Sequence, residues 1–226
     1  MNKEDIALNY DNDLNPNFFR IRANVIKKLI NQYKPKNVLE VGCGTGIFLD
    51  HFHESFERAV GIDNCKPMLE FAEKHHKRNN IRYIFSIDNH LPFKDNQFDM
   101  VLSMGVIEYV ENQKKHIEEC MRVIRKGGVL FLTTPTKSMT GIYGAVRKIG
   151  LAAERYWTIS RYLSFDELHT LVRKNRAKII EHNILFFNPS NIRTLDYFFK
   201  LVKSIIPGKL HKYLLGVQYL VVKKSI

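Results

Sequence analysis

The stretch that decides the fold runs from Val38 to Gly46 and reads VLEVGCGTG. An apolar run with one acid in its middle is followed by three glycines at every second position, which is typical of a strand that ends in a glycine-rich turn. Such a turn brings backbone close to a nucleotide-like ligand. A dinucleotide-binding turn would need its third glycine at position 47, where this sequence has Ile47. The stretch therefore predicts a nucleotide-like cofactor that is not a dinucleotide.

Glu40 is the acid within this strand, two residues before the first glycine. An unpaired carboxylate is costly to bury, so Glu40 must face a hydrogen-bond donor near the carboxyl end of the strand. A ligand ammonium group, or the backbone of a neighbouring turn that holds the ligand, would serve as that donor.

Residues 36–136 alternate between strand-like and helix-like segments, as a parallel α/β sheet requires. We expect strands at 37–42, 58–63, 81–87, 98–105 and 129–135, and helices at 15–33, 47–56, 65–79 and 116–128. The last of these helices should end at Gly127 and Gly128. Further strands at 177–187 and 217–224 follow a helix that Ser164 and Glu167 begin as a capping box. The predicted fold class is α/β, a doubly wound, mostly parallel sheet of seven strands.

The 226 residues suit one domain, 1–226, with four parts. Residues 1–35 form an N-terminal helical cap, and 36–136 form the cofactor-binding core. Residues 137–163 interrupt the alternation and are expected to form a helical lid, because long connections in compact domains usually carry function. Residues 164–226 complete the sheet and contain a basic amphipathic insert at 191–210.

Charge and cysteine content restrict the partners and the compartment. Residues 1–136 hold 19 Lys+Arg against 18 Asp+Glu, whereas 137–226 hold 16 against 5, so the second part carries nearly all of the net charge of +12. This asymmetry indicates an anionic partner of the second part, or simply a soluble basic surface. The three cysteines have no CxxC spacing. No apolar run approaches the roughly 20 residues that span a bilayer, and the N-terminus lacks the pattern of a secretory signal. A cytoplasmic location is expected.

The run E-x-G-x-G-x-G, from Glu40 to Gly46, resembles the signature of the class I S-adenosylmethionine-dependent methyltransferases. Three further stretches agree in order and separation: VGIDNCKPMLEFA at 60–72, LPFKDNQFDMVLSMGVIEYV at 91–110 and MRVIRKGGVLFLTTP at 121–135. The resemblance covers roughly residues 36–136 closely. It implies the Rossmann-like fold of that family, S-adenosyl-L-methionine as the cofactor and methyl transfer as the reaction.

The resemblance also implies roles for individual residues. Asp63 would accept hydrogen bonds from both ribose hydroxyls, and Met68 with the region of Asn64 would flank the adenine. The turn and the end of the fourth strand would supply the other expected cofactor contacts, which are Glu40, Gly42, Cys43, Gly44, Gly46, Ser103 and Met104.

One departure concerns the acid that usually holds the adenine amino group after the third strand. Without gaps that acid falls on Ile87, and in a form one residue longer it falls on Ser86. Asp88 is the carboxylate that remains available there, so we expect it to take this role, with the backbone of Asn89 meeting the edge of the ring.

The family has no fixed catalytic residue, because the cofactor carries the activated methyl group. Where the family often has Glu-His, this chain has Glu108-Tyr109, so a histidine base is missing there. Tyr109 and His90 are the weak catalytic candidates, and we expect His116 to be a surface or capping histidine. The remaining histidine pairs, His51 with His53 and His75 with His76, are expected on solvated helix faces, with no metal site.

The acceptor is predicted to be a small molecule or a lipid-like compound, with an apolar or aromatic body and an anionic group. The DNA-base amino methyltransferase motif is absent, since the sequence after the fourth strand reads SMGV, and no Cys-Pro pair suits pyrimidine methylation. Expected substrate contacts are aromatic: Tyr10, Tyr143, Tyr156, Trp157 and Tyr162. The basic insert could lie on an anionic membrane surface. Two alternatives remain, an RNA methyltransferase that grips phosphates through the basic part and a catalytically silent cofactor-binding partner subunit.

Overall fold

The computed structural model describes residues 16–87, 90–137, 161–175, 177–185, 205 and 217–225. Its strands are β1 (Asn37–Val41), β2 (Arg58–Asp63), β3 (Ile81–Phe85), β4 (Phe98–Met104), β5 (Ile124–Pro135), β6 (Ala177–Leu185) and β7 (Val217–Lys224). Its helices are α2 (Pro16–Tyr33), α3 (Ile47–His51), α4 (Lys66–His75), α5 (Gln113–Val123) and α7 (Phe165–Arg173), with a 3₁₀ turn η1 at His53–Ser55.

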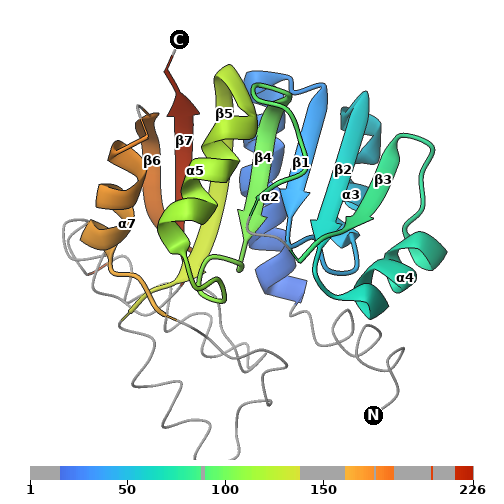
Figure 1. The fold of residues 1–226 in the computed structure, drawn as a ribbon, viewed down its shortest axis with the longest axis horizontal. Coiled ribbons are helices and arrows are strands. Elements are labelled where there is room, and N and C mark those ends of the chain that lie inside the picture. The colour runs from blue at the N-terminus through green and yellow to red at the C-terminus, as the bar shows by residue number, and fades with distance from the viewer. Residues whose placement is uncertain are drawn as a thin grey trace, which may run out of the picture.

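The seven strands form one sheet in the order β3-β2-β1-β4-β5-β7-β6 (Figure 1). The first five strands run parallel, while β7 lies between β5 and β6 and is antiparallel to both. The order reverses between β1 and β4, which places a topological switch point at their carboxyl ends. Ligands of open α/β sheets bind at such a point. The predicted fold class is therefore confirmed, and the topology places a site beside the glycine turn.

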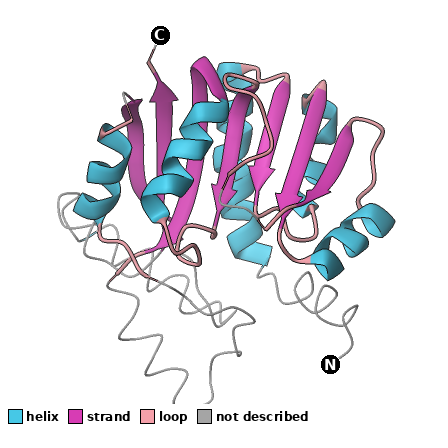
Figure 2. Cartoon of the chain, viewed as in Figure 1, coloured by secondary structure: helices cyan, strands magenta, loops and turns pink. Residues whose placement is uncertain are grey.

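Helices cover both faces of the sheet (Figure 2). The core on one face combines inner residues of α2, α3 and α4 with alternate strand residues, for example Ile26, Leu49 and Met100. The core on the other face combines α5 and α7 with the intervening strand residues, for example Ile117 and Leu168. Strands β1 and β4 are buried from both sides, as central parallel strands should be.

Two local expectations need correction. The helix expected to run to the glycines ends at Val123, because Ile124 is fully buried and pairs with Phe98 as the first residue of β5. The helix expected at 47–56 is only five residues long and passes into η1. Its Phe48, together with Phe52 and Phe56, still reaches the core.

The capping box of α7 is confirmed. The Ser164 hydroxyl accepts a hydrogen bond from the backbone N–H of Glu167, and the Glu167 carboxylate accepts one from the backbone N–H of Ser164. Just before it, Leu163 forms a parallel bridge with Thr136, so these two residues, which flank the segment 138–160 in the sequence, lie side by side. That segment, and all of the basic insert except residue 205, lies outside the described residues. Among the described residues, no helix is both long and apolar enough to cross a bilayer.

Candidate functional site

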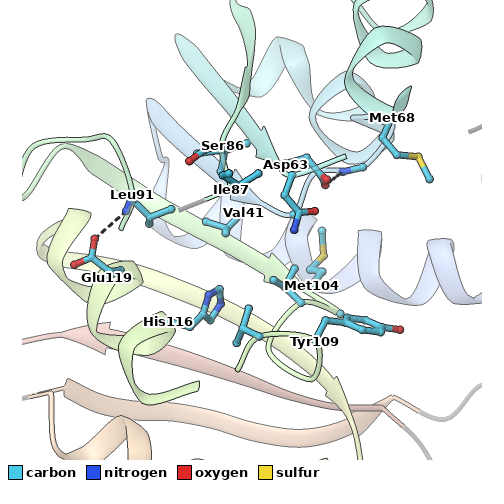
Figure 3. A pocket seen from close by; sticks show the side chains of 17 residues that line it. Val41, Asp63, Met68, Ser86, Ile87, Leu91, Met104, Tyr109, His116 and Glu119 are labelled. Atoms are coloured by element: carbon cyan, nitrogen blue, oxygen red, sulfur yellow. Dashed lines mark hydrogen bonds between the residues drawn. The ribbon is translucent and has the colours of Figure 1, made fainter. Parts of the chain in front are cut away.

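A cavity of about 260 Å³ opens at the carboxyl ends of β1, β2 and β4 (Figure 3). Its floor comes from the ends of the strands and the glycine turn, and its sides come from the start of α4, the segments after β3 and β4, and α5. The residues that line it are Val41, Gly42, Gly44, Ile62, Asp63, Asn64, Met68, Ser86, Ile87, Leu91, Met104, Gly105, Val106, Tyr109, Val110, His116 and Glu119.

The glycine turn is anchored to β2 and packed tightly against the segment after β4. The backbone N–H groups of Gly42 and Cys43 both donate to the carbonyl of Ile62, at 2.8 and 3.1 Å. Gly42 has φ of +69°, and a Cβ there would lie 2.3 Å from Cγ2 of Val106. A side chain at Gly42 would therefore both strain the backbone and collide with the cavity wall.

Asp63 joins the glycine turn to the start of α4. Its Oδ2 accepts a hydrogen bond from the backbone N–H of Gly44, and its Oδ1 accepts one from the backbone N–H of Cys65, each at 2.8 Å. Burial raises the pKa of this carboxyl above its ordinary value, and the backbone hydrogen bonds oppose that rise. Each oxygen keeps a lone pair, so Asp63, which lines the cavity, can still accept hydrogen bonds from ligand hydroxyls.

Glu40 lies behind the turn rather than in the cavity wall, and it is 3% exposed. Its Oε2 has no hydrogen-bond partner among the described residues. Burial raises the pKa of Glu40 to about 8, although the nearby charge of Arg22 lowers it and that of Asp63 adds to the rise. A buried carboxylate in this state is suited to a cationic ligand group, which would compensate the cost of its burial.

Arg22 is a second buried charge at this end of the cavity, and the sequence did not mark it. It projects from α2, is 7% exposed, and its charge is the main influence opposing the raised pKa of Glu40. A Cβ built on Gly105 would lie 3.6 Å from Nη2 of Arg22 and 3.7 Å from Oε1 of Glu108. Gly105 lines the cavity, so charges of both signs stand close behind its wall.

His116 is not the surface or capping histidine that we expected. It lines the cavity, and its Nε2 lies 2.9 Å from Oγ of the fully buried Ser103 on β4. Figure 3 shows its ring pointing into the cavity from α5. Burial lowers the pKa of His116 to about 4, so the imidazole is neutral at physiological pH. The spacing of His116 to the buried Cys120 and Val123 at i+4 and i+7 would have predicted the inner face of α5.

Glu119 holds the segment after β3 against α5. Its carboxylate accepts hydrogen bonds from the backbone N–H of Leu91 at 2.9 Å and from Nε and Nη2 of Arg122. Burial would raise its pKa, but the bonds from Arg122 and Leu91 lower the pKa to about 2. His90 approaches the same carboxylate at 2.9 Å, with 64% of its side chain exposed, and lies outside the cavity lining.

Of the thirteen predicted site residues that the structure describes, seven line the cavity. Predicted residues that line the cavity are Gly42, Gly44, Asp63, Asn64, Met68, Met104 and Tyr109. Predicted residues that are described but do not line it are Glu40, Cys43, Gly46, His90, Ser103 and Tyr162. Predicted residues outside the described part of the chain are Tyr10, Asp88, Asn89, Tyr143, Tyr156 and Trp157. Lining residues that were not predicted are Val41, Ile62, Ser86, Ile87, Leu91, Gly105, Val106, Val110, His116 and Glu119.

Cys43 shows why a motif position need not be a contact. Its side chain is buried, and its Sγ would lie 2.7 Å from a Cβ on Gly61 of β2, so it packs beneath the turn. Most of the unpredicted lining residues lie at strand ends or follow them, and that position is the signal that could have found them.

The site suits a ligand that carries hydroxyls, a positive charge and a flat ring. Asp63 offers acceptor capacity for hydroxyls, and the buried carboxylate of Glu40 suits a cation. The apolar side chains of Met68, Ile62 and Leu91 line the walls for a ring. These features fit S-adenosyl-L-methionine. Among the described residues, no group of three or more His, Cys, Asp or Glu side chains could hold a metal ion.

Comparisons with known proteins agree with this site. The family model of a methyltransferase domain matches residues 39–132. The ubiquinone biosynthesis O-methyltransferase of Pelagibacter ubique is 26% identical over 203 residues, which cover 81% of this chain and 84% of that one. The malonyl-[acyl-carrier protein] O-methyltransferase of Hamiltonella defensa is 30% identical over 145 residues, covering 64% of this chain and 54% of that one.

Solved structures share the fold at lower identity. The S-adenosylmethionine-dependent methyltransferase of Mesorhizobium loti superposes with a TM-score of 0.61 and 15% identity, covering 84% of this chain and 91% of that one. The [4+2]-cyclase SpnF superposes with a TM-score of 0.62 and 18% identity, covering 89% and 80%. One fold thus carries different reactions, and the acceptor must be argued from the site.

Proposed function

The chain is a class I S-adenosylmethionine-dependent methyltransferase, and from that premise we propose that it methylates an ionised oxygen on a small-molecule or lipid-like acceptor with an apolar or aromatic body. The observation that carries this proposal is the cavity, whose lining joins the glycine turn and Asp63 to apolar and aromatic side chains at Tyr109 and Val110. A donor and an acceptor can therefore meet within one enclosure.

The cofactor end of the cavity has the groups that the donor needs. Asp63 would hold the ribose hydroxyls, and the charges of Glu40 and Arg22 would act on the charged amino-acid end from behind the cavity wall. Met68 and Leu91 would enclose the adenine, with His116 at the cavity wall. When bound, the cofactor supplies a methyl group on a positively charged sulfur, ready for in-line displacement. These residues bind and orient it, which is where an enzyme of this kind gains most of its rate.

Among the described residues, the lining proposed for the acceptor is largely apolar. It comprises Met104, Tyr109 and Val110, and Tyr109 adds an aromatic face. Such a wall favours an acceptor with an apolar or aromatic body and excludes water from the reacting atoms. It offers little to a hydrated, highly polar acceptor.

The titratable groups of the wall favour an acceptor that is already ionised. Among the described lining residues these groups are Asp63, Tyr109, His116 and Glu119. Glu119 has a pKa of about 2 and is bound by Arg122, and His116 has a pKa of about 4. Both are weak bases at neutral pH. A carboxylate, or the phenolate of an acidic phenol, has already lost its proton at neutral pH and needs no base. These two oxygen nucleophiles therefore fit the cavity best.

Two further observations support an anionic oxygen acceptor. The relatives from Pelagibacter and Hamiltonella are both named as O-methyltransferases. Residues 137–226 hold 16 Lys+Arg against 5 Asp+Glu, which would attract an anionic acceptor or an anionic membrane surface that contains it.

The proposal is tested by binding and transfer in sequence. Calorimetry with S-adenosylhomocysteine comes first, and the absence of binding would refute the cofactor assignment. Transfer of labelled methyl is then measured with acidic phenols and aromatic carboxylates, each beside a blocked control, the methyl ether or the amide. We expect labelling of the ionisable member of a pair and none of its control. Labelling of RNA in place of every small molecule would overturn the acceptor class, and cofactor binding without any transfer would favour a silent partner subunit.

A further inference from the structure

Two side chains that do not line the cavity support the glycine turn from beneath. They are His76, which follows α4, and Tyr83 of β3. We had expected His76 to lie on a solvated helix face with His75. It is instead half-buried, whereas His75 is exposed.

The imidazole of His76 contacts the turn directly. Its Nδ1 lies 2.7 Å from the carbonyl oxygen of Thr45, a fully buried residue between Gly44 and Gly46. A carbonyl only accepts hydrogen bonds, so Nδ1 carries the proton and donates.

Tyr83 closes the arrangement on the other side of the turn. Its hydroxyl donates to the backbone carbonyl of His76 at 3.0 Å. Gly46 has φ of +77°, and a Cβ there would lie 2.3 Å from the Tyr83 hydroxyl oxygen. The third glycine of the motif is therefore required by the tyrosine that packs against it. Thr45, Gly46, Tyr83 and His76 form a closed ring of contacts beneath the cofactor loop.

The helix that leads to His76 also reaches the cavity. At one end of α4, Asp63 binds the N–H groups of Gly44 and Cys65, and Met68 lines the cavity. At the other end, the backbone N–H of His76 caps the helix by donating to Ala72 at 2.8 Å. The segment from Asp63 to His76 therefore contacts the glycine turn at both of its ends, through Asp63 and through the ring of His76.

We propose that His76 and Tyr83 are positioning residues for cofactor binding, which hold the backbone of Thr45 and Gly46 in the conformation that the methionine end of the cofactor requires. The cofactor half of this statement rests on the proposed function. The positioning half concerns the turn itself and can be tested without any ligand. Loss of either contact frees the turn, so binding must order it again and the affinity falls.

The experiment compares His76→Ala with His75→Ala in the full chain. The two histidines are neighbours, and His75 stacks on Phe71 without contacting the turn, which makes it a matched control. His76→Asn keeps an N–H donor near the position of Nδ1, and Tyr83→Phe removes only the hydroxyl. Amide hydrogen exchange of residues 42–46 without ligand is measured first, followed by the dissociation constant of S-adenosylhomocysteine and by KM and kcat.

We expect His76→Ala and Tyr83→Phe to speed exchange in residues 42–46 and to raise the dissociation constant about 2- to 10-fold, as loss of one hydrogen bond implies. KM for the cofactor should rise by a similar factor, while kcat at saturation stays within about 2-fold because bound cofactor restores the turn. His75→Ala should behave as wild type, and His76→Asn should recover part of the loss.

A uniform rise in exchange over the whole sheet would assign these residues to general stability and overturn the inference. Unchanged exchange in 42–46 for His76→Ala would overturn it as well, and this variant remains decisive if Tyr83→Phe fails to fold. A wild-type chain that binds no S-adenosylhomocysteine refutes the proposed function instead, while the exchange comparison still judges the positioning role.

Discussion

Two acids on neighbouring strands differ in how well hydrogen bonds compensate their charge. One lies where the parallel strands begin, here called the amino edge of the sheet, and the other lies where they end, the carboxyl edge. Asp99, at the amino end of β4, accepts hydrogen bonds from the backbone N–H groups of Lys36 and Asn37, both at 2.7 Å, and from Arg125. Glu40, near the carboxyl end of β1, has an Oε2 without a hydrogen-bond partner among the described residues. Burial acts to raise both pKa values, yet hydrogen bonds leave that of Asp99 lowered while that of Glu40 rises to about 8.

The contrast separates stability from function. At the amino edge, charged groups have partners, as when Arg125 pairs with Asp99 and Lys224 donates to the backbone carbonyls of Arg122 and Ile124. At the carboxyl edge, the pKa values of the buried acids Glu40 and Asp63 stay raised, and a protein keeps such groups where a ligand can supply a missing partner. Substitutions at the two edges should therefore affect different measurements.

The largest effect should follow Asp63→Ala at the carboxyl edge. The change removes an acceptor for ligand hydroxyls and the bridge between Gly44 and Cys65. Two charged hydrogen bonds at about 1.5–3 kcal/mol each imply that the affinity for S-adenosylhomocysteine falls by at least about 100-fold. Calorimetry checks this, with Asp99→Ala as the control that should bind as wild type. If Asp63→Ala bound S-adenosylhomocysteine almost as tightly as the wild type, Asp63 would not be a cofactor-binding residue. The proposed functional difference between the two edges would then be wrong.

The second prediction concerns Glu40→Gln and the dependence of stability on pH. The folded pKa of about 8 exceeds the ordinary value of 4.5, so the folded chain binds more protons between these values. Stability of the wild type should therefore fall as pH rises from about 4.5 through 8, relative to Glu40→Gln, by on the order of 4 kcal/mol. Urea unfolding at pH 5 and pH 8.5 without ligand measures the difference.

Addition of S-adenosylhomocysteine sharpens the same test. A ligand cation beside Glu40 favours its charged form, so bound ligand should reduce the extra pH dependence of the wild type. If the free energy of unfolding depended on pH in the same way for the wild type and Glu40→Gln, the charge of Glu40 would already be compensated within the protein. The carboxyl edge would then resemble the amino edge in having paired acids.

The third prediction is Asp99→Ala at the amino edge. It leaves the N–H groups of Lys36 and Asn37 without their acceptor and removes the partner of Arg125. The free energy of unfolding should fall by about 2 kcal/mol, because these are hydrogen bonds to a charged group. Denaturant unfolding provides the value. A large accompanying loss of cofactor affinity would contradict the separation of the two edges.

The sequence predicted the carboxyl edge well where a local pattern carried the information. The strand, the three glycines and the acid after β2 follow one another in the chain, and parallel topology brings them together. The observed strand order and the antiparallel β7 agree with the predicted fold class, a mostly parallel sheet of seven strands. The start of β5 was predicted wrongly because the local sequence at Ile124 suits either a longer helix or a strand. The pairing with Phe98 of β4, a residue distant in the sequence, determines that it is a strand.

The rest of the site depends on contacts between distant residues. Arg22 approaches Glu40 from 18 residues earlier, and Tyr83 fixes Gly46 from 37 residues later, so no local pattern marks either. His116 and His76 looked like helix-surface residues, because a lone polar side chain does not reveal which face it takes. The aromatic contacts expected at Tyr143, Tyr156 and Trp157 lie outside the described residues and remain predictions.

The smallest effect should be the coupling between His116 and Ser103, which tests whether the carboxyl edge contains any pair as well satisfied as those at the amino edge. The pair joins Nε2 to Oγ at 2.9 Å, and Ser103 is fully buried. His116→Val leaves a buried hydroxyl without its partner, whereas His116→Val with Ser103→Ala removes both polar groups. The double variant should therefore be more stable than the sum of the single losses by about 1 kcal/mol.

The dependence of this coupling on pH identifies its charge state. Because burial lowers the pKa of His116 to about 4, the bond is made by a neutral ring, and the coupling energy should be equal at pH 6 and pH 8. The folded pKa lies below the ordinary 6.5, so the stability that His116 contributes is present above 6.5 and is lost as pH falls toward 4. That slope is opposite in sign to the slope from Glu40 in the same range. If the coupling instead grew between pH 8 and pH 6, His116 would be protonated in the fold, and the carboxyl edge would contain a paired cation like those of the amino edge.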